Sequence, residues 1–209
     1  MIDAKFYYCI LSFYQLSFFE EDKIPVQSVR TIGKYPHDKK AFTQGFELYQ
    51  GIFYESIGLR GESELRKVEP LTGQIIHRVP LKPKYFGEGI TILDERIYQL
   101  TWQSGTGFIY RLEDFSLVRE FQIDGQGWGL TNDGRNLILS NGSDALIFMD
   151  PQTLEIVKKI LVTMDGKPLH FLNELEFIKE EIWANVWKKD YIVRINKETG
   201  QVVGILDLS

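Results

Sequence analysis

The sequence of 209 residues is 44% hydrophobic, 25% charged and 13% aromatic. This balance excludes a disordered, collagen-like or disulfide-rich chain and is typical of a protein with a packed core. The net charge of −5 reveals no basic excess, so we expect no nucleic-acid partner. The single cysteine, Cys9, excludes an internal disulfide bond.

Residues 1–23 differ from the rest of the chain because Phe6–Phe19 form a largely apolar and aromatic stretch. The stretch is shorter than the roughly 20 residues of a membrane-spanning helix and has the length of a signal-peptide core. Asp3 offsets Lys5 before it, and no small-residue cleavage site follows it. We interpret it as a remnant secretory signal, which predicts a secreted or periplasmic protein with membrane association only through residues 6–19. The alternatives are a terminal strand or helix packed on the domain, or a wrongly assigned start.

From Ile24 onward, β-branched and aromatic runs alternate with turn sequences such as Asn132-Asp133-Gly134 and Lys197-Glu198-Thr199-Gly200. This pattern predicts an all-β fold. Four segments align, with starts 44, 40 and 45 residues apart; they open with Gln44, Glu88, Trp128 and Asn173. Each segment is followed by three more predicted strands, and four strands in roughly 40 to 45 residues are the signature of a β-propeller blade.

The predicted propeller occupies residues 24–209, with blades at about 41–81, 86–123, 127–162 and 172–208. Val26–Gly33 has the character of an outermost fourth strand, yet no blade precedes it. We expect this segment to close the ring by completing the last blade. The strand count therefore predicts a five-bladed β-propeller whose last blade lacks its inner strands in this chain, and a closed four-bladed ring is the alternative.

The register of the repeat predicts a site at the centre of the ring. The first strand of each blade lies beside the central axis, so the four opening residues converge in space although they are far apart in sequence. Two carboxamides, one carboxylate and one indole are not what core packing favours, and they predict a pocket for a small polar fragment. Trp102 and Trp187 end the predicted second strands of blades two and four, in matching positions, and are expected at the same opening. A carboxylate among aromatic walls would have a raised pKa, which suits proton transfer.

Eight motifs follow one another between Lys34 and Ser209. They are Phe42-Thr43-Gln44-Gly45, Tyr54-Glu55-Ser56, Gly58-Leu59-Arg60-Gly61-Glu62-Ser63-Glu64-Leu65-Arg66, Phe86-Gly87-Glu88-Gly89-Ile90-Thr91, Leu100-Thr101-Trp102, Gly127-Trp128-Gly129-Leu130-Thr131, Asn173-Glu174-Leu175-Glu176 and Ala184-Asn185-Val186-Trp187. In this order and spacing they resemble the glutaminyl cyclases (glutamine cyclotransferases) of the plant and bacterial type. The resemblance implies a five-bladed propeller that converts the N-terminal glutamine of a peptide or protein to pyroglutamate and releases ammonia.

The chemistry of this reaction, together with the resemblance, suggests a role for each converging residue. The attacking α-amine has to be neutral, the developing oxyanion needs donors, and the leaving nitrogen needs a proton. We expect Glu88 to carry the proton from the amine to the leaving group, and Gln44 and Asn173 to hold the substrate amide and amine. The walls that exclude water are predicted to be Phe42, Phe86, Trp102, Trp128 and Trp187. No cofactor is required for this chemistry, a structural metal ion in the central channel stays open, and we expect a monomer.

Three features depart from the pattern of the resembled family. The family usually carries an acidic residue at the position of Gln126, and it often carries an aspartate at the position of Asn141. The family also has later inner strands with a lysine-bearing Thr-Gly-Lys stretch, which has no counterpart up to Ser209, so the activity of this chain is left open. The alternative function is a catalytically impaired propeller that binds peptides or proteins. A propeller lactonase is a third option, although it would need several ligands around a metal.

Other polar residues are expected to have ordinary surface roles. Glu174 and Glu176 flank the end of the predicted site and are expected to face solvent or to pair with lysine or arginine. His37, His77 and His170 do not share a spacing that suggests metal binding, so we expect surface or loop histidines.

Overall fold

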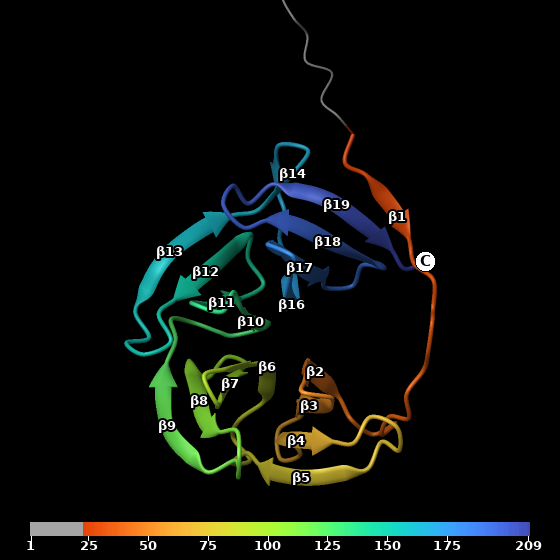
Figure 1. Cartoon of the computed structure of the whole chain (residues 1–209). Coiled ribbons are helices and arrows are strands. Elements are labelled where there is room, and N and C mark those ends of the chain that lie inside the picture. The colour runs from red at the N-terminus through yellow and green to blue at the C-terminus, as the bar shows by residue number, and fades with distance from the viewer. Residues whose placement is uncertain (1–22) are drawn as a thin grey trace, which may run out of the picture.

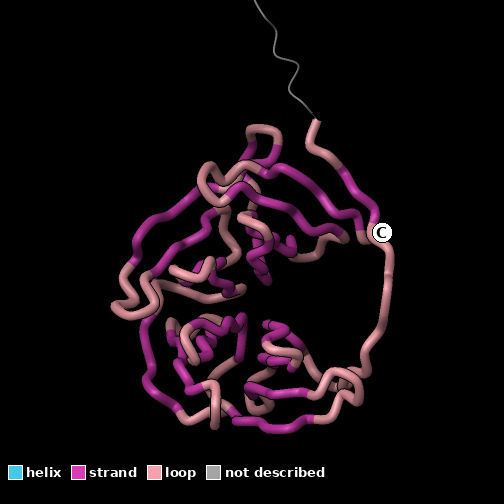
Figure 2. The backbone as a smooth tube through the Cα atoms, in the orientation of Figure 1, coloured by secondary structure: helices cyan, strands magenta, loops and turns pink. Residues whose placement is uncertain are grey.

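The computed structural model describes residues 23–209, so Cys9 and the apolar stretch Phe6–Phe19 lie outside the described residues. Strands and turns make up this part of the chain, and because it contains no helix, none of its residues forms a helix that could cross a membrane. Four sheets stand around a common centre (Figures 1 and 2). The all-β prediction and the propeller arrangement are confirmed, with four blades among the described residues.

Each blade is an antiparallel sheet whose strands follow in chain order from the centre outward. Blade one consists of β2 (Thr43–Tyr49), β3 (Ile52–Ile57), β4 (Glu64–Val68) and β5 (Ile75–Pro80). Blade two consists of β6 (Gly87–Leu93), β7 (Arg96–Thr101), β8 (Thr106–Arg111) and β9 (Leu117–Gln122). Blade three consists of β10 (Leu130–Asn132), β11 (Leu137–Ser140), β12 (Ala145–Met149) and β13 (Ile156–Leu161). Blade four consists of β16 (Leu172–Ile178), β17 (Glu181–Val186), β18 (Tyr191–Asn196) and β19 (Val202–Asp207).

Two elements lie outside this repeat. A small hairpin, β14 (Thr163–Met164) with β15 (Lys167–Pro168), joins blades three and four. The N-terminal strand β1 covers only Val26–Ser28 and pairs in parallel with β19. The strand predicted over Val26–Gly33 is therefore too long, and it joins the outer edge of blade four instead of completing a separate last blade. The reason is that residues 29–33 are exposed and leave the sheet, running along the outside of the ring towards β2 (Figure 1).

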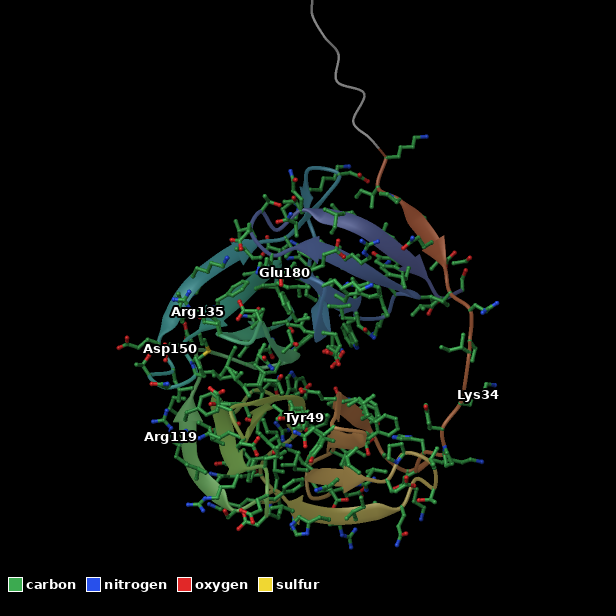
Figure 3. The ribbon with its side chains drawn as sticks, viewed as in Figure 1. Lys34, Tyr49, Arg119, Arg135, Asp150 and Glu180 are labelled. Carbon is green, nitrogen blue, oxygen red and sulfur yellow. The ribbon has the colours of Figure 1, made fainter. Side chains whose placement is uncertain are left out.

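The hydrophobic core lies between neighbouring blades and consists of three clusters. Side chains alternate between the two faces of a strand, so a blade with a neighbour on each side buries both faces. The strand β6 shows this most clearly, because all of its residues are buried. The outer strands are more exposed, and Arg119 and Asp150 lie at the outer edge of the ring while Lys34 lies on the segment between β1 and β2 (Figure 3). The inner strands are therefore packed closely against one another around the central axis.

Glycines allow the inner strands to approach one another backbone to backbone. A Cβ atom at Gly45 would lie 2.5 Å from the Ile90 nitrogen, and one at Gly89 would lie 2.5 Å from the Leu130 nitrogen. A Cβ atom at Gly129 would collide with the Asn173 carbonyl oxygen. These glycines directly follow Gln44, Glu88 and Trp128, so the close approach that requires them also brings the predicted site residues together. In blade four the equivalent position holds Glu174.

Candidate active site

The eight predicted site residues converge on one pocket with a volume of about 590 Å³. The pocket is lined by Phe42, Thr43, Gln44, Gly45, Phe86, Glu88, Trp102, Trp128, Asn173, Glu174, Asn185 and Trp187. Every blade contributes at least one side chain to this lining. The convergence that the repeat register predicts is therefore present, and the chemical role of each residue stays a prediction.

Three of the polar residues stand in β-bulges at the start of the inner strands. The register between β2 and β3 shifts between Thr43 and Gly45, so Gln44 is the extra residue. The register of β6 shifts between Gly87 and Ile90, and that of β16 shifts between Leu172 and Leu175. A bulge disrupts the ladder locally and re-aims a side chain. This is how Gln44, Glu88 and Asn173 leave the regular alternation of a strand and line the pocket.

In blade three the side chain of Ser140 holds the segment that precedes β10. Trp128 and Gly129 precede β10, and the Gly129 amide donates to the Ser140 hydroxyl oxygen at 2.8 Å. The same hydroxyl donates to the Asn173 carbonyl oxygen at 2.7 Å. Ser140 is fully buried and thereby connects the site segments of blades three and four.

The aromatic walls are built by a backbone hydrogen bond that recurs in different blades. The Trp102 amide donates to the Phe86 carbonyl oxygen at 3.0 Å, and the Trp187 amide donates to that of Phe171 at 2.9 Å. Phe86 packs edge-on against Trp102 with ring centroids 5.5 Å apart, and Phe42 packs edge-on against Phe86 at 6.1 Å. These rings extend one wall of the pocket from blade one to blade two.

Behind Trp187, a wall residue, lies an aromatic residue that the sequence reasoning missed and that does not itself line the pocket. Trp128 and Trp187 pack edge-on at 5.9 Å, and Phe171 tilts against Trp187 at 6.1 Å. Phe171 stands two residues before Asn173, as Phe42 does before Gln44 and Phe86 before Glu88. The repeat alignment therefore contained the signal for Phe171 as an aromatic residue at the rim.

A turn in blade three makes room for the Trp128 ring. Gly142 has a φ of +81°, a conformation that favours glycine, and a Cβ atom there would lie 2.7 Å from the ring. The buried Nε1 of Trp128 has no hydrogen-bond partner among residues 23–209. Gly142 is thus required both by the turn and by the neighbouring indole.

The pKa of Glu88 is strongly raised, and burial is the cause of the shift. Its residue exposure is 5%, and burial raises the pKa of its carboxyl to about 9. No charge or hydrogen bond from the described residues offsets this effect. At neutral pH the carboxyl is therefore protonated.

The expectation for Glu174 and Glu176 is wrong. Neither side chain is exposed, and Glu174 lines the pocket. Burial raises the pKa of Glu174 well above its ordinary value, and the neighbouring Glu176 raises it further. Burial raises the pKa of Glu176 to about 7, with Glu47 adding to the effect. Glu174 stands in the bulge of β16 and accepts from the Phe46 backbone of β2, whereas Glu176 is regularly paired with Trp183. Nearby, Glu47 accepts a hydrogen bond from the Ile92 amide at 3.0 Å.

The two departures at Gln126 and Asn141 lie side by side. The Gln126 Nε2 donates to the Asn141 carbonyl oxygen at 3.3 Å, while the Asn141 Oδ1 accepts from Ser143. Neither residue is among those that line the pocket. Thr43, Gly45 and Asn185, by contrast, line the pocket. All three belong to the motifs quoted above, although the sequence reasoning assigned them no role.

The chain is similar to known proteins in sequence and in fold. Residues 6–209 match the family described as glutamine cyclotransferase. The chain is 42% identical over 187 residues to glutaminyl-peptide cyclotransferase of Arabidopsis thaliana, covering 88% of this chain and 58% of the relative. It superimposes on the crystal structure of Myxococcus xanthus glutaminyl cyclase with a TM-score of 0.83 and 33% identity, covering 88% of this chain and 78% of that one.

A more distant likeness concerns the fold alone. The WD40 repeats of RRP9 match with a TM-score of 0.57 and 7% identity, covering 83% of this chain and 66% of that one. The chain spans 58% of the length of its Arabidopsis relative, so that relative contains substantial sequence with no counterpart here.

Proposed function

The chain belongs to the glutamine cyclotransferase family, and on this premise we propose that its pocket converts an N-terminal glutamine of peptides or proteins to pyroglutamate with release of ammonia. The observation that carries the proposal is Glu88, a buried acid with a pKa of about 9 inside an aromatic pocket that also presents two carboxamides. A neutral acid at this place can protonate a leaving nitrogen without first receiving a proton from solvent.

The proposed reaction needs one bond to form and one to break. The neutral α-amine of the substrate attacks its own side-chain carbonyl carbon, and a carbon–nitrogen bond closes the five-membered ring. The carbon–nitrogen bond to the side-chain NH₂ then breaks, and ammonia leaves. Glu88 gives its proton to the leaving nitrogen and regains a proton from the attacking amine, so it returns to its starting state. Proton transfer of this kind typically contributes about 10²- to 10⁴-fold to a rate.

The other lining residues are proposed to bind and orient the substrate. Gln44 and Asn173 each offer one acceptor oxygen and one NH₂ donor, which can hold the side-chain amide and the amine. The aromatic walls exclude water and favour the folded-back substrate conformation in which the amine meets the carbonyl carbon. The orientation is supported by the bulges, which direct these side chains towards one centre.

No cofactor takes part in the proposed proton transfer, because the substrate supplies both nucleophile and leaving group. A structural cation in the central channel stays a proposal without an assigned ligand set. Glu47 raises the pKa of both Glu174 and Glu176. No group of three or more histidine, cysteine, aspartate or glutamate side chains within residues 23–209 is arranged to hold a metal ion. No step is therefore assigned to a metal.

We further propose that the whole protein is a five-bladed propeller. The four blades cover 78% of the Myxococcus structure, and the segment between β1 and β2 runs along the outside of the ring without pairing to another strand (Figure 1). A fifth blade between blades four and one would give this segment a neighbour. A structure of the protein expressed from its whole coding region tests the proposal, and a ring closed by four blades would contradict it.

The activity is tested by measuring ammonia release and mass loss from a synthetic peptide that begins with glutamine. We expect turnover with this peptide, none with a matched peptide that begins with asparagine, and a loss of about 10²-fold or more in Glu88→Gln. The exposed Glu113→Gln is the matched control and is expected to keep the wild-type rate. An unchanged rate in Glu88→Gln would disprove the role of Glu88.

The second candidate is a peptide-binding module without turnover. It is favoured by the 58% coverage of the Arabidopsis relative, since residues outside this span can belong to that protein's site. Calorimetric binding of the glutamine peptide with no ammonia release would support it. We also propose a secreted or periplasmic location and a monomeric state, which fractionation of expressing cells and sedimentation of the purified chain would test.

A further inference from the structure

One buried carboxylate near the pocket has no part in the proposed reaction. Glu55 lies on β3 in blade one, and its residue exposure is only 1%. A carboxylate is retained in such a place only when it is paired and hydrogen-bonded. Glu55 has three partners: the Thr43 hydroxyl donates to its Oε1 at 2.5 Å, the His37 Nε2 lies 2.8 Å from the same oxygen, and the Arg66 Nη1 lies 3.9 Å from its Oε2.

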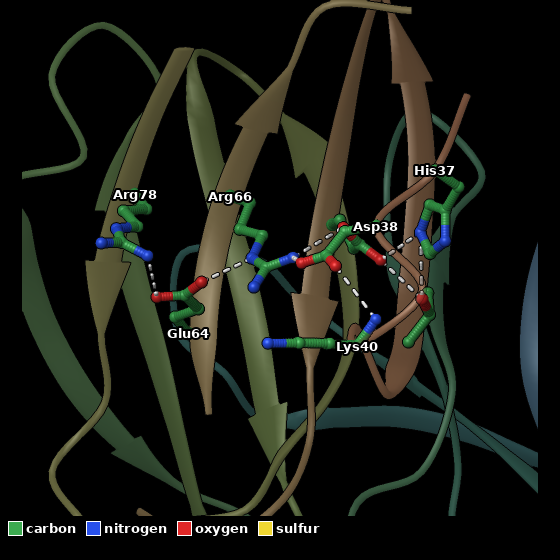
Figure 4. A network of polar contacts seen from close by, with 8 residues as sticks. His37, Asp38, Lys40, Glu64, Arg66 and Arg78 are labelled. Atoms are coloured by element: carbon green, nitrogen blue, oxygen red, sulfur yellow. Dashed lines mark hydrogen bonds and ion pairs between the residues drawn. The ribbon is translucent and has the colours of Figure 1, made fainter. Parts of the chain in front are cut away.

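The partners of Glu55 belong to the segment that enters the site. His37 is a loop residue ahead of β2, and Thr43 is the first residue of β2, directly before Gln44. Figure 4 shows that the network continues outward through Arg66 to Glu64 and Arg78, and through Arg66 to Asp38. Glu55 thus ties the incoming segment to the rigid interior of blade one.

This anchoring matters because Gln44 stands in a bulge. The ladder between β2 and β3 pairs Thr43 with Ile57 and Gly45 with Ser56, so Gln44 has no partner across the sheet. On one side Gly45 is held by its close approach to the inner strand of blade two. On the other side the Thr43 hydroxyl restrains the bulge through its short bond to Glu55, with a longer contact of 3.4 Å to the His37 Nε2.

We propose that Glu55 is a positioning residue which, through the Thr43 hydroxyl, fixes the β-bulge that directs Gln44 into the pocket. The proposal rests on the proposed function for its effect on turnover, while the anchoring itself is a property of the ligand-free chain. A loosened bulge would let Gln44 move away from the substrate amide. A displacement of about 1 Å at a positioning group can cost on the order of 10²-fold in rate.

Inner segments of blades two and three are anchored in a similar way by neutral groups. The Gly87 amide donates to the Ser63 hydroxyl oxygen at 3.0 Å, and the Gly129 amide donates to the Ser140 hydroxyl oxygen at 2.8 Å. In blade one the anchor is instead an acid that accepts from a hydroxyl on the bulged strand. The recurrence of a polar anchor behind the inner segment supports a positioning role over a purely structural ion pair.

The test compares Thr43→Val, Glu55→Met and the double variant with wild type; methionine has a similar length and no oxygen acceptor. Thr43→Val keeps the shape of the side chain and removes the donor. We expect kcat/KM for the glutamine peptide to fall about tenfold, mainly through KM because Gln44 binds substrate. The double variant is expected to lose no more than the worse single variant, since Thr43→Val removes the donor and Glu55→Met removes the acceptor of one bond. Thr43→Ser, which retains the hydroxyl, is expected to recover most of the loss.

Glu64→Gln is the control for general damage to the network. Glu64 binds Arg66 and Arg78 in the same network and has no contact with Thr43. This variant is expected to lose stability with kcat/KM unchanged. Equal losses of kcat/KM in Glu64→Gln and Thr43→Val, or additive losses in the double variant, would overturn the proposal.

Amide hydrogen exchange separates this proposal from the proposed function. In the ligand-free chain, Thr43→Val is expected to speed exchange at Gln44 and Gly45 at least fivefold relative to Glu64→Gln. If the wild-type chain shows no cyclisation, the proposed function fails, but the exchange result still tests whether Glu55 anchors the bulge through Thr43. Unchanged exchange at both amides in Thr43→Val would overturn the proposal that Glu55 anchors the bulge.

Discussion

Replacing Glu88 by glutamine should make the protein more stable while removing its proposed activity. In the unfolded chain this carboxyl has its ordinary pKa of 4.5, whereas burial raises the folded-state pKa to about 9. Between these values the folded state retains a proton that the unfolded state has lost, so stability falls as the pH rises. At pH 7 the interval is about 2.5 pH units, and at about 1.4 kcal/mol per unit the cost is about 3 kcal/mol.

Urea unfolding of wild type and Glu88→Gln at pH 5, 7 and 8 measures this cost. The stability difference between them should grow in favour of the variant by about 3 kcal/mol from pH 5 to pH 7 and by about 1 kcal/mol more to pH 8, because both intervals lie below the folded-state pKa of about 9. Any offset caused by the new amide is the same at each pH. Glu113→Gln removes one charge from the surface and controls for the change in net charge. Parallel stability curves for wild type and Glu88→Gln would refute the reasoning, because they would mean that Glu88 is solvated or paired in the folded chain.

Three further changes test the structure around the pocket. Gly142→Ala should cost about 1–3 kcal/mol in urea unfolding because it combines a positive φ with a collision against Trp128, and unchanged stability would contradict that packing. Ser140→Ala should cost about 1–3 kcal/mol because the buried Gly129 amide loses its acceptor; Ser143→Ala, in the neighbouring turn, serves as the comparison. Phe171→Ala should weaken glutamine-peptide binding several-fold with little loss of stability, as followed by tryptophan fluorescence, since Phe171 is 51% exposed and contacts Trp187. Equal affinity in Phe171→Ala would exclude it from the rim of the site.

The repeat explains why so much of the site could be predicted. Equivalent positions in successive blades have equivalent places around the axis. The alignment of Gln44, Glu88, Trp128 and Asn173 therefore predicted that these four residues lie close together in the folded protein. The same argument reached Trp102 and Trp187, which follow matching strands. It would also have reached Phe171 if the residues two positions earlier had been compared.

The positions that escaped prediction depend on contacts between blades. Glu174 looked like a surface residue, but it occupies the place of a glycine in the other blades and its side chain is turned inward by a bulge. Glu55 belonged to a recognised motif without an assigned task, and the task emerges only when His37 and Thr43 are seen beside it. The strand over Val26–Gly33 failed because its pairing depends on a neighbour rather than on its own residues.

The sequence alone therefore determined the strand repeat, the register of the blades and the set of side chains that meet at the centre, because these follow from periodicity. Tertiary structure decided which of those side chains are buried and which are held by a partner. Burial and pairing determine the pKa of Glu88 and the direction of Gln44, and both depend on atoms from other blades or strands. A linear pattern specifies the period of a strand, whereas the environment of a carboxyl group is a property of the assembled ring.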